Sequence, residues 1–283
     1  MISVSDTRFV TFLFISVVIP FSTSSWLDEL KRTDDNKWQG KWFPMPPNQK
    51  NDTNPIVSLE ELHDDKHGIK MGVSSANCDN AQVNLEVDWL DDATNYTCYE
   101  NKQSFLPNEN VRALFSQDYI PKEYSAPHKC MTESINYSHY IPTFGAHRPL
   151  WAKYGEYEFV PKQRWLHNLE HGAIVMLYHP CANYQEVNYL KDIVTTCLYR
   201  HVITPYNLLT QERPLALVSW GRRLEMSMVD PKIVINFIKT FAKHGPERTH
   251  KDGQYGYKLL KASEPPLDVS DSIVCARFQD AEM

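Results

Sequence analysis

The sequence predicts an α+β domain in which a single mixed β-sheet is flanked by helices and stabilised by disulfide bonds. Three observations lead to this fold class. Short apolar runs alternate with segments of helical periodicity that carry capping residues at their ends. Six cysteines, an even number, all lie beyond the first quarter of the chain. Of the 283 residues, 42% are hydrophobic and 12% aromatic, which is enough for a large folded core.

The charge of the chain limits its partners. The formal net charge of -6 argues against nucleic acid, because phosphate binding needs a cationic surface. Residues 221–261 hold nine Lys/Arg against four Asp/Glu, and we interpret this excess first as a solvated helix face. We therefore expect no nucleic-acid partner. A protein partner is compatible with this composition but is not identified by it.

Residues 1–25 have the pattern of a secretory signal peptide. Arg8 precedes an apolar run over residues 9–21, and small residues follow up to Ser25. The run is short for a membrane span, and no later segment approaches eighteen apolar residues. We expect a protein secreted or held in the lumen of the secretory pathway, with membrane attachment only if the signal is not cleaved.

The rest of the chain divides by composition. Residues 26–57 are polar and without period, and they predict a linker or arm. Residues 58–262 are expected to form the α+β domain. Residues 263–283 form a C-terminal tail that we expect to be ordered only if Cys275 ties it to the domain. Within the domain, strict apolar alternation over residues 83–90 predicts a half-buried strand.

A short helix is predicted next, followed by a buried strand. Pro161 suits a first helical position and Gly172 suits a left-handed C-terminal cap, so residues 161–172 should form about three turns. The continuous apolar run over residues 173–179 is too short for another helix. It predicts a central strand buried on both faces.

Two further helices and three strands complete the predicted domain. Asn183 can cap a helix that ends near Arg200, and Asp230 can cap a second helix with Pro231 first and Gly245 as its stop. Strands are predicted at residues 201–204 and 215–220, with a turn at Gly221 leading into residues 222–226.

The cysteines predict up to three disulfides, formed by Cys78, Cys98, Cys130, Cys181, Cys197 and Cys275. A local bridge between Cys78 and Cys98, across the expected strand, is the favoured pairing. A bridge between Cys181 and Cys197 is excluded, because a helix between them would separate them by roughly 20 Å. Sequons for N-glycosylation at Asn51, Asn95 and Asn136 agree with a secretory route.

Two elements carry a family resemblance. Residues 142–147 read PTFGAH and residues 167–172 read HNLEHG, inside a longer run over residues 138–181 that continues at residues 213–226. This run resembles the p53-inducible protein thirteen family and its wider domain family of unknown function, over about residues 131–245. Phe144 and Ala146 depart from the P-T-S-G-P-H form of bacterial relatives. The resemblance implies a regulatory role in growth but no established reaction.

The histidines suggest a metal site. His167 and His171 are four residues apart on the expected helix, so both imidazoles can reach one ion. Imidazole and carboxylate suit zinc or copper, and the candidate ligands are His139, His147, His167, Glu170 and His171. The alternative is a structural histidine cluster that packs against aromatic side chains and the helix C-terminus.

A catalytic interpretation is also open. HNLEH fits H-x-x-E-H, in which two histidines bind zinc and the glutamate, here Glu170, activates water; Glu247 is then a distant third ligand. However, Gly172 closes the helix directly after His171. The sequence favours a secretory-pathway binding or regulatory domain over this zinc-dependent hydrolase, and a metal carrier without turnover is a third alternative.

Overall fold

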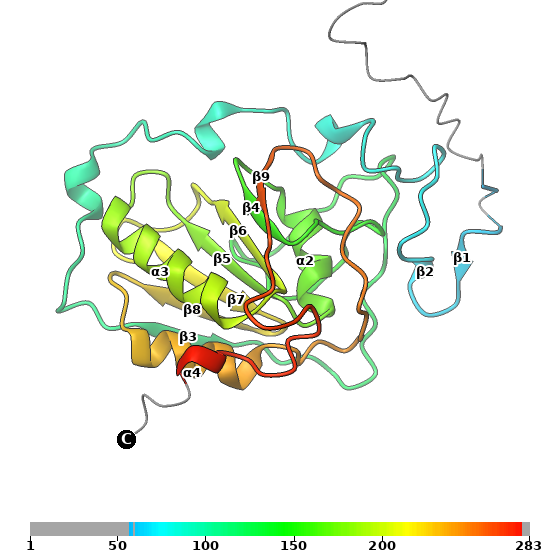
Figure 1. The fold of residues 1–283 in the computed structure, drawn as a ribbon. Coiled ribbons are helices and arrows are strands. Elements are labelled where there is room, and N and C mark those ends of the chain that lie inside the picture. Colours follow the sequence, from blue (N-terminus) through cyan, green and yellow to red (C-terminus); the bar gives the residue numbers. More distant parts are fainter. Residues whose placement is uncertain (1–56, 59, 279–283) are drawn as a thin grey trace, which may run out of the picture. The chain divides into compact units, whose positions relative to one another are not determined.

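A computed structural model describes residues 57, 58 and 60–278 of the chain (Figure 1). The expected signal peptide, the linker up to residue 56 and the sequon at Asn51 lie outside the described residues. A mixed sheet forms the centre of the fold, as the sequence predicted, and it has seven strands. The strands, in their spatial order, are β3 (Leu114–Gln117), β8 (Arg222–Met226), β7 (Leu215–Ser219), β5 (Ile174–Tyr178), β6 (His201–Pro205), β4 (Gly155–Tyr157) and β9 (Leu259–Ala262). A separate hairpin pairs β1 (His63–Asp64) with β2 (Gly68–Ile69).

The strand β5 lies in the middle of the sheet and confirms the predicted central strand. It pairs parallel with β6 and antiparallel with β7. Because side chains alternate along a strand, Val175 and Leu177 enter one apolar core while Ile174 and Met176 enter the other. All four are fully buried. The continuous apolar run therefore reflects a sheet covered on both faces.

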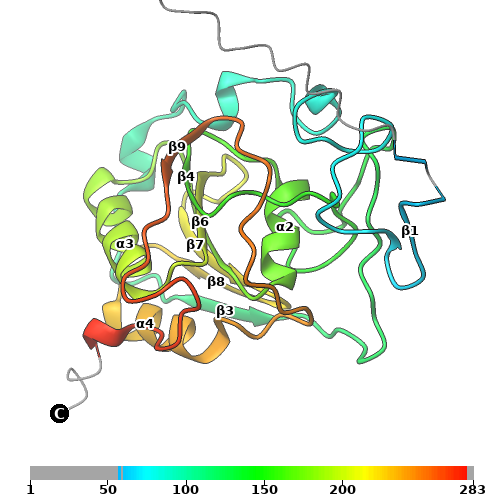
Figure 2. The same ribbon diagram turned by 45° about the vertical axis from the view of Figure 1, so that its right-hand side comes forward.

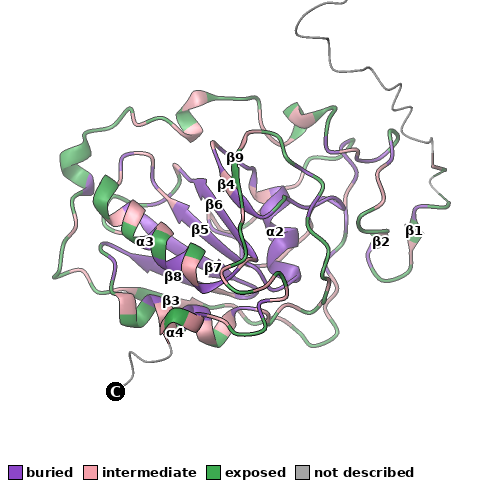
Figure 3. Ribbon diagram, in the orientation of Figure 1, coloured by how far each residue is buried: buried purple, intermediate pink, exposed green. Residues whose placement is uncertain are grey.

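The helices divide between these two faces. The helix α2 (Lys162–Glu170) packs on the first face, whereas α3 (Tyr184–Cys197) and α4 (Pro231–Phe241) pack on the second (Figure 2). Figure 3 shows that α2 is buried along nearly its whole length, while α3 and α4 have exposed outer surfaces. The short helix carrying the family element is thus enclosed by the rest of the fold.

The predicted helix caps are present. The side chain of Asn183 accepts hydrogen bonds from the amides of Gln185 and Glu186 at the start of α3. Asp230 caps the first turn of α4 in the same way. Two boundaries differ from the prediction: Pro161 is the N-cap of α2 and not its first residue, and α4 ends before Lys243, whose φ of 66° leaves the helical region.

The strand predicted for residues 83–90 is wrong. Its centre forms a 3-10 helix (Leu85–Val87), preceded by Asn84 with a φ of 57°. The Oδ1 atom of Asn80 accepts hydrogen bonds from the amides of Gln82 and Val83, which turns the chain away from an extended path. Val83 is 51% exposed and Leu90 79% exposed, so the alternating pattern does not mark a buried face here.

Three disulfides join Cys78 to Cys130, Cys98 to Cys181 and Cys197 to Cys275. The favoured pairing of Cys78 with Cys98 is therefore wrong, because residues 83–90 do not form the strand that would have aligned these two cysteines. The exclusion of a bridge between Cys181 and Cys197 is confirmed. The three bonds are consistent with an oxidising, secretory or extracellular environment.

The described part of the tail is attached to the domain through Cys275. The amide of Cys275 also donates a hydrogen bond to the carbonyl of Cys197, and Asp271 accepts hydrogen bonds from the amides of Tyr199 and Arg200. Among the described residues, no helix has the length and apolar character needed to cross a bilayer.

The two sequons within the described residues have different surroundings. Asn136 is exposed on a loop. Asn95 is half-buried: its Oδ1 atom accepts a hydrogen bond from the indole of Trp89, and its amide lies 3.4 Å from Asn207. Asn136 is thus the more accessible acceptor for a glycan, and modification of either residue stays a prediction.

The buried side chain of His201 leads us to expect that the stability of the fold depends on pH. Burial lowers the pKa of His201 in β6 to about 4, and its Nδ1–H donates to the carbonyl of Leu198. The unfolded chain takes up this proton near pH 6.5, so stability falls as the pH drops from about 6.5 towards 4, by up to about 3 kcal/mol. Urea unfolding between pH 7 and 4.5 should show a shallower decline for His201→Gln than for the wild type. The exposed control His244→Gln should keep the wild-type slope; equal slopes in all three proteins contradict the prediction.

Candidate metal centre

The helix α2 carries polar side chains into a buried environment. His167, Asn168 and Glu170 are at most 1% exposed, and His171 directly follows the helix. Asn168 is satisfied by the backbone of Ala152, from which it accepts one hydrogen bond and to which it donates another. His167 and Glu170, three residues apart, lie on a common side of the helix and face segments from elsewhere in the chain.

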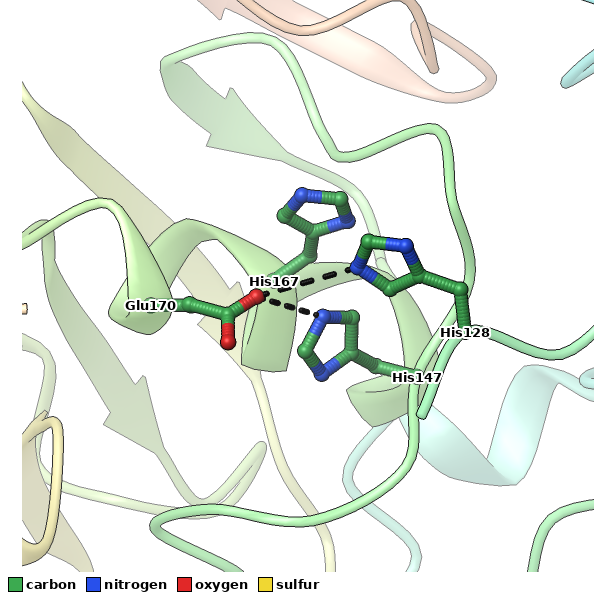
Figure 4. A group of neighbouring side chains, drawn as sticks. All are labelled: His128, His147, His167 and Glu170. Carbon is green, nitrogen blue, oxygen red and sulfur yellow. Dashed lines mark ion pairs between the residues drawn. The ribbon is translucent and has the colours of Figure 1, made fainter. Parts of the chain in front are cut away.

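Two loop histidines meet this side of the helix. The rings of His128 and His147 lie within 5 Å of the ring of His167, measured between centroids, and all three converge with the carboxylate of Glu170 (Figure 4). The backbones of His128 and His147 pair as an isolated parallel bridge, which fixes the two loops beside each other. One donor atom from each of the four residues lies within 4.8 Å of every other. These residues, His128, His147, His167 and Glu170, are called the inner site.

Each inner-site ring has the same orientation. The Nδ1 atom of His128 lies 2.6 Å from the carbonyl of Ile69, that of His147 lies 2.8 Å from Gly145, and that of His167 lies 2.6 Å from Arg148. A carbonyl only accepts, so each Nδ1 must carry the proton. The Nε2 atoms of His128 and His147 are left to face the carboxylate of Glu170 (Figure 4). Backbone carbonyls hold metal-binding histidines in this same way.

Several polar atoms at the centre of the inner site are buried without a hydrogen bond. In the part of the chain that the structure describes, the Nε2 atoms of His128, His147 and His167 and one oxygen of Glu170 are buried without a hydrogen-bond partner. That oxygen lies 3.0 Å from Nε2 of His147 and 3.7 Å from Nε2 of His128. A lone pair and a carboxylate at this distance repel each other unless a proton or a metal cation lies between them.

The electrostatics favour a cation at this position. Burial alone raises the pKa of Glu170, but the imidazoles of His128 and His147 outweigh burial and hold the pKa well below its usual range. Burial and the neighbouring imidazoles lower the pKa of His167 far below its ordinary value. Positive charge on the His128 and His147 side of Glu170 keeps its carboxylate ionised, and a metal ion at their Nε2 atoms would supply that charge as a proton does, while the His167 imidazole stays neutral.

A second group of donors adjoins the inner site. The Nε2 atom of His67 lies 3.0 Å from an oxygen of Glu247, and these two residues form, with Glu170, another set of donor atoms within 4.8 Å of one another. Asp64 lies 3.5 Å from the other ring nitrogen of His67. The ring of His67 stacks on that of His128 at 4.7 Å. His67, Glu170 and Glu247 are called the outer site.

The structure brings some predicted ligands together and separates others. His147, His167 and Glu170 are inner-site residues. His139 is not: its Nδ1 contacts the backbone of Ile141 and its ring stacks on Tyr140. His171 packs against His167 and Trp151, with its pKa lowered by burial to about 4, but it is not in the four-donor set.

Sequence reasoning missed His67 and His128. His128 lies ahead of the two family elements, and His67 lies about a hundred residues before His167, with no ligand spacing to any of them. Glu247, suggested as a third ligand for the hydrolase, lies in the outer site.

The arrangement does not fit the H-x-x-E-H interpretation. That mechanism needs His167 and His171 as ligands and Glu170 as a base for water. Here Glu170 supplies one of the clustered donor atoms, and His171 does not. The inner-site side chains are also at most 2% exposed, whereas a catalytic zinc keeps a position open to substrate.

Gly245 allows the outer-site segment to pack on the end of α2. A Cβ added to Gly245 would lie 2.0 Å from the carbonyl oxygen of Glu170 and 2.5 Å from the amide of Gly172. Two residues later, the amide of Glu247 donates a hydrogen bond to the same carbonyl. We expect Gly245→Ala to lower the free energy of unfolding by about 1–3 kcal/mol, because the backbone must move apart.

The matched control for this change is Gly256→Ala. A Cβ there would meet only the Lys153 side chain, at 3.4 Å or more, so urea unfolding should show little change. Equal effects of the two substitutions would show that the close approach at Gly245 contributes nothing to stability.

Comparison with known proteins relates this site to a family. Residues 128–254 match the family described as protein of unknown function (DUF3105). The DUF3105 segment contains the whole inner site and Glu247, but not His67. A stretch of 67 residues, 24% of this chain, is 32% identical to tumor protein p53-inducible protein 13 of Rattus norvegicus and spans 17% of that protein's length. No solved structure matches the chain.

Proposed function

We propose that the domain is a metal-binding module of the secretory pathway, in which the inner site holds one zinc or copper ion. The observation that carries this proposal is a group of three buried imidazoles, each with Nδ1–H on a backbone carbonyl and an Nε2 without a hydrogen bond; the Nε2 atoms of His128 and His147 face Glu170. An ion at the centre satisfies all four donors at once. Protons alone would leave several imidazole nitrogens directed at one another.

The donor distances suit a four-coordinate ion. Ligands about 2.0–2.1 Å from a tetrahedral zinc are about 3.3 Å from one another. The distances of 3.0 Å and 3.7 Å from Glu170 to His147 and His128 lie on either side of this value. Three imidazoles and a carboxylate suit zinc or copper and exclude neither. The absence of thiolate is consistent with the disulfide-bonded state of the six cysteines.

The closed site favours a structural or regulatory role for the ion. All four ligands come from inside the domain and are nearly inaccessible, so the ion would join α2 to the loops of His128 and His147. A binding or regulatory ectodomain, as the resemblance to p53-inducible proteins implies, is then stabilised by its metal. A growth-regulatory role belongs to the same proposal and rests on that resemblance alone.

The test is elemental analysis of protein secreted from cells and purified without chelators. We expect about one zinc or copper ion per chain in the inner site, retained on dialysis and lost in His147→Gln. Chelation of the wild type should lower its melting temperature, and adding the ion back should restore it.

The matched control is His63→Gln, because the side chain of His63 is 63% exposed and lies outside both donor sets. This variant should keep the metal content and melting temperature of the wild type. A wild-type protein without stoichiometric metal, and without a thermal shift on addition of zinc or copper, would refute the proposal and leave a purely structural histidine cluster.

A further inference from the structure

We infer that the outer site binds a second divalent ion, held by His67 and Glu247 and bridged to the inner ion by the carboxylate of Glu170. This inference rests on the proposed inner metal site and adds a distinct position to it. Its ligand class is the same, a borderline divalent transition metal such as zinc, because the donors are one imidazole and two carboxylates.

The first support is the geometry of the donors. Nε2 of His67 lies 3.0 Å from Oε1 of Glu247, close to the spacing of two ligands on one ion. One donor atom of His67 and one of Glu247 also lie within 4.8 Å of a carboxylate oxygen of Glu170, which belongs to the inner site as well. Nε2 of His67 and the second carboxylate oxygen of Glu247 are buried without a hydrogen-bond partner among the described residues. The imidazole is 95% buried, with a side-chain exposure of 5%.

The second support is how His67 is oriented. Its Nδ1 atom faces the carboxylate of Asp64, which also accepts hydrogen bonds from the amides of Lys66 and His67. A carboxylate behind one ring nitrogen favours a proton on that nitrogen and leaves the other free to coordinate. The amide of His128 donates to the carbonyl of His67, so the hairpin that carries His67 is fixed beside the inner site.

The third support is the balance of charge. Two divalent ions bring four positive charges, and the carboxylates of Asp64, Glu170 and Glu247 offset three of them. In this structure the ammonium group of Lys66 forms an ion pair with Glu247, with Nζ 2.6 Å from Oε1. The Lys66 side chain is 56% exposed, so it can move into solvent when an ion takes its place.

The two positions differ in access. The inner ligands are nearly inaccessible, whereas the Glu247 side chain is 9% exposed beneath Lys66. Three protein ligands also leave the outer ion one position for water. We therefore expect the outer ion to bind more weakly than the inner ion, by about tenfold or more, and to exchange faster.

The experiment is a titration of the full chain, freed of metal by a chelator that is then removed, with Zn²⁺ and, in a separate sample, with Co²⁺ as a spectroscopic probe. The wild type should bind two ions in two steps, and Glu247→Gln only one, with the tight step unchanged. Two Co²⁺ ions bridged by Glu170 should couple magnetically, so the electron paramagnetic resonance signal per ion should fall when the second ion binds. Glu212→Gln, whose side chain is 64% exposed, is the matched control and should bind two.

A second variant keeps the inference testable if Glu247→Gln does not fold. Lys66→Met removes the cation that competes at Glu247, and the second step should become roughly fivefold tighter. One ion in both the wild type and Glu247→Gln would overturn the outer site and leave the proposed function intact. No ion in the wild type would overturn both.

Discussion

Replacement of Arg164 by methionine is expected to lower the free energy of unfolding by about 3–5 kcal/mol. The guanidinium of Arg164 forms a bidentate ion pair with Asp79, at 2.5 Å and 3.0 Å, and both side chains are fully buried. It also donates to the carbonyl of Leu150. The substitution preserves much of the side-chain volume but leaves the Asp79 carboxylate buried without its counter-charge, and that uncompensated charge is the main cost.

Urea unfolding at neutral pH measures this effect, and two variants define its origin. Arg213→Met breaks the ion pair with Glu212, whose side chain is 64% exposed, and should cost less than about 1 kcal/mol. Adding Asp79→Leu to Arg164→Met removes the isolated charge and should recover much of the loss. A single Arg164→Met variant as stable as Arg213→Met would contradict the buried-charge argument.

Removal of the disulfide between Cys197 and Cys275, by alanine at both positions, should lower the free energy of unfolding by about 4 kcal/mol. The bond closes a sequence separation of 78 residues, and a loop of this length restricts the unfolded chain strongly. It also attaches the segment carrying Asp271, which accepts hydrogen bonds from the backbone amides of the two residues just before β6.

Urea unfolding of the double-alanine variant tests this value, with peptide mapping to verify that the other two disulfides persist. A loss below about 1 kcal/mol would mean that Asp271 and the packing around Cys275 hold the segment without the covalent bond. The variant should then retain a wild-type melting temperature, which would contradict the prediction.

The elements predicted well from sequence are those with agreeing local signals. Asn183 and Asp230 cap helices whose apolar positions repeat at helical spacing, and Gly172, with a φ of 80°, ends α2 where expected. The edge strands β3 and β9, and the strand β4 beside β9, were not predicted. Each has only three or four residues and exists through pairing with a distant partner, so no local period marks it.

The strand predicted for residues 83–90 is wrong for the opposite reason, since its local pattern is strong. Its alternation is strong, but alternation reports a sheet only where one side of the strand is covered. Asn80 and Asn84 instead turn the chain at the surface. The side chain of Asp88 points into the interior, where it forms an ion pair with Arg148. The incorrect disulfide between Cys78 and Cys98 followed from this one misassigned strand.

The candidate site was predictable where the ligands share an element. His167 and Glu170 occur three residues apart in a helix, and His147 is the last residue of the PTFGAH element. His67 and His128 reach the site through tertiary contacts between loops, which no sequence pattern encodes. The sequence led us to expect His167 and His171 as joint ligands. In the structure His167 is grouped with Glu170 instead, because the surrounding loops approach that side of the helix.

The backbone bonds among the site's loops have a consequence for its thermodynamics. The amide of His128 is bonded to the carbonyl of His67, and the amide of Lys129 to that of His147, so three ligand-bearing segments are joined by their main chains. The conformational entropy of collecting distant ligands is therefore lost during folding, before an ion arrives. Binding of the proposed ion would then need little reorganisation, and its affinity should be governed by desolvation and donor chemistry at a preorganised site.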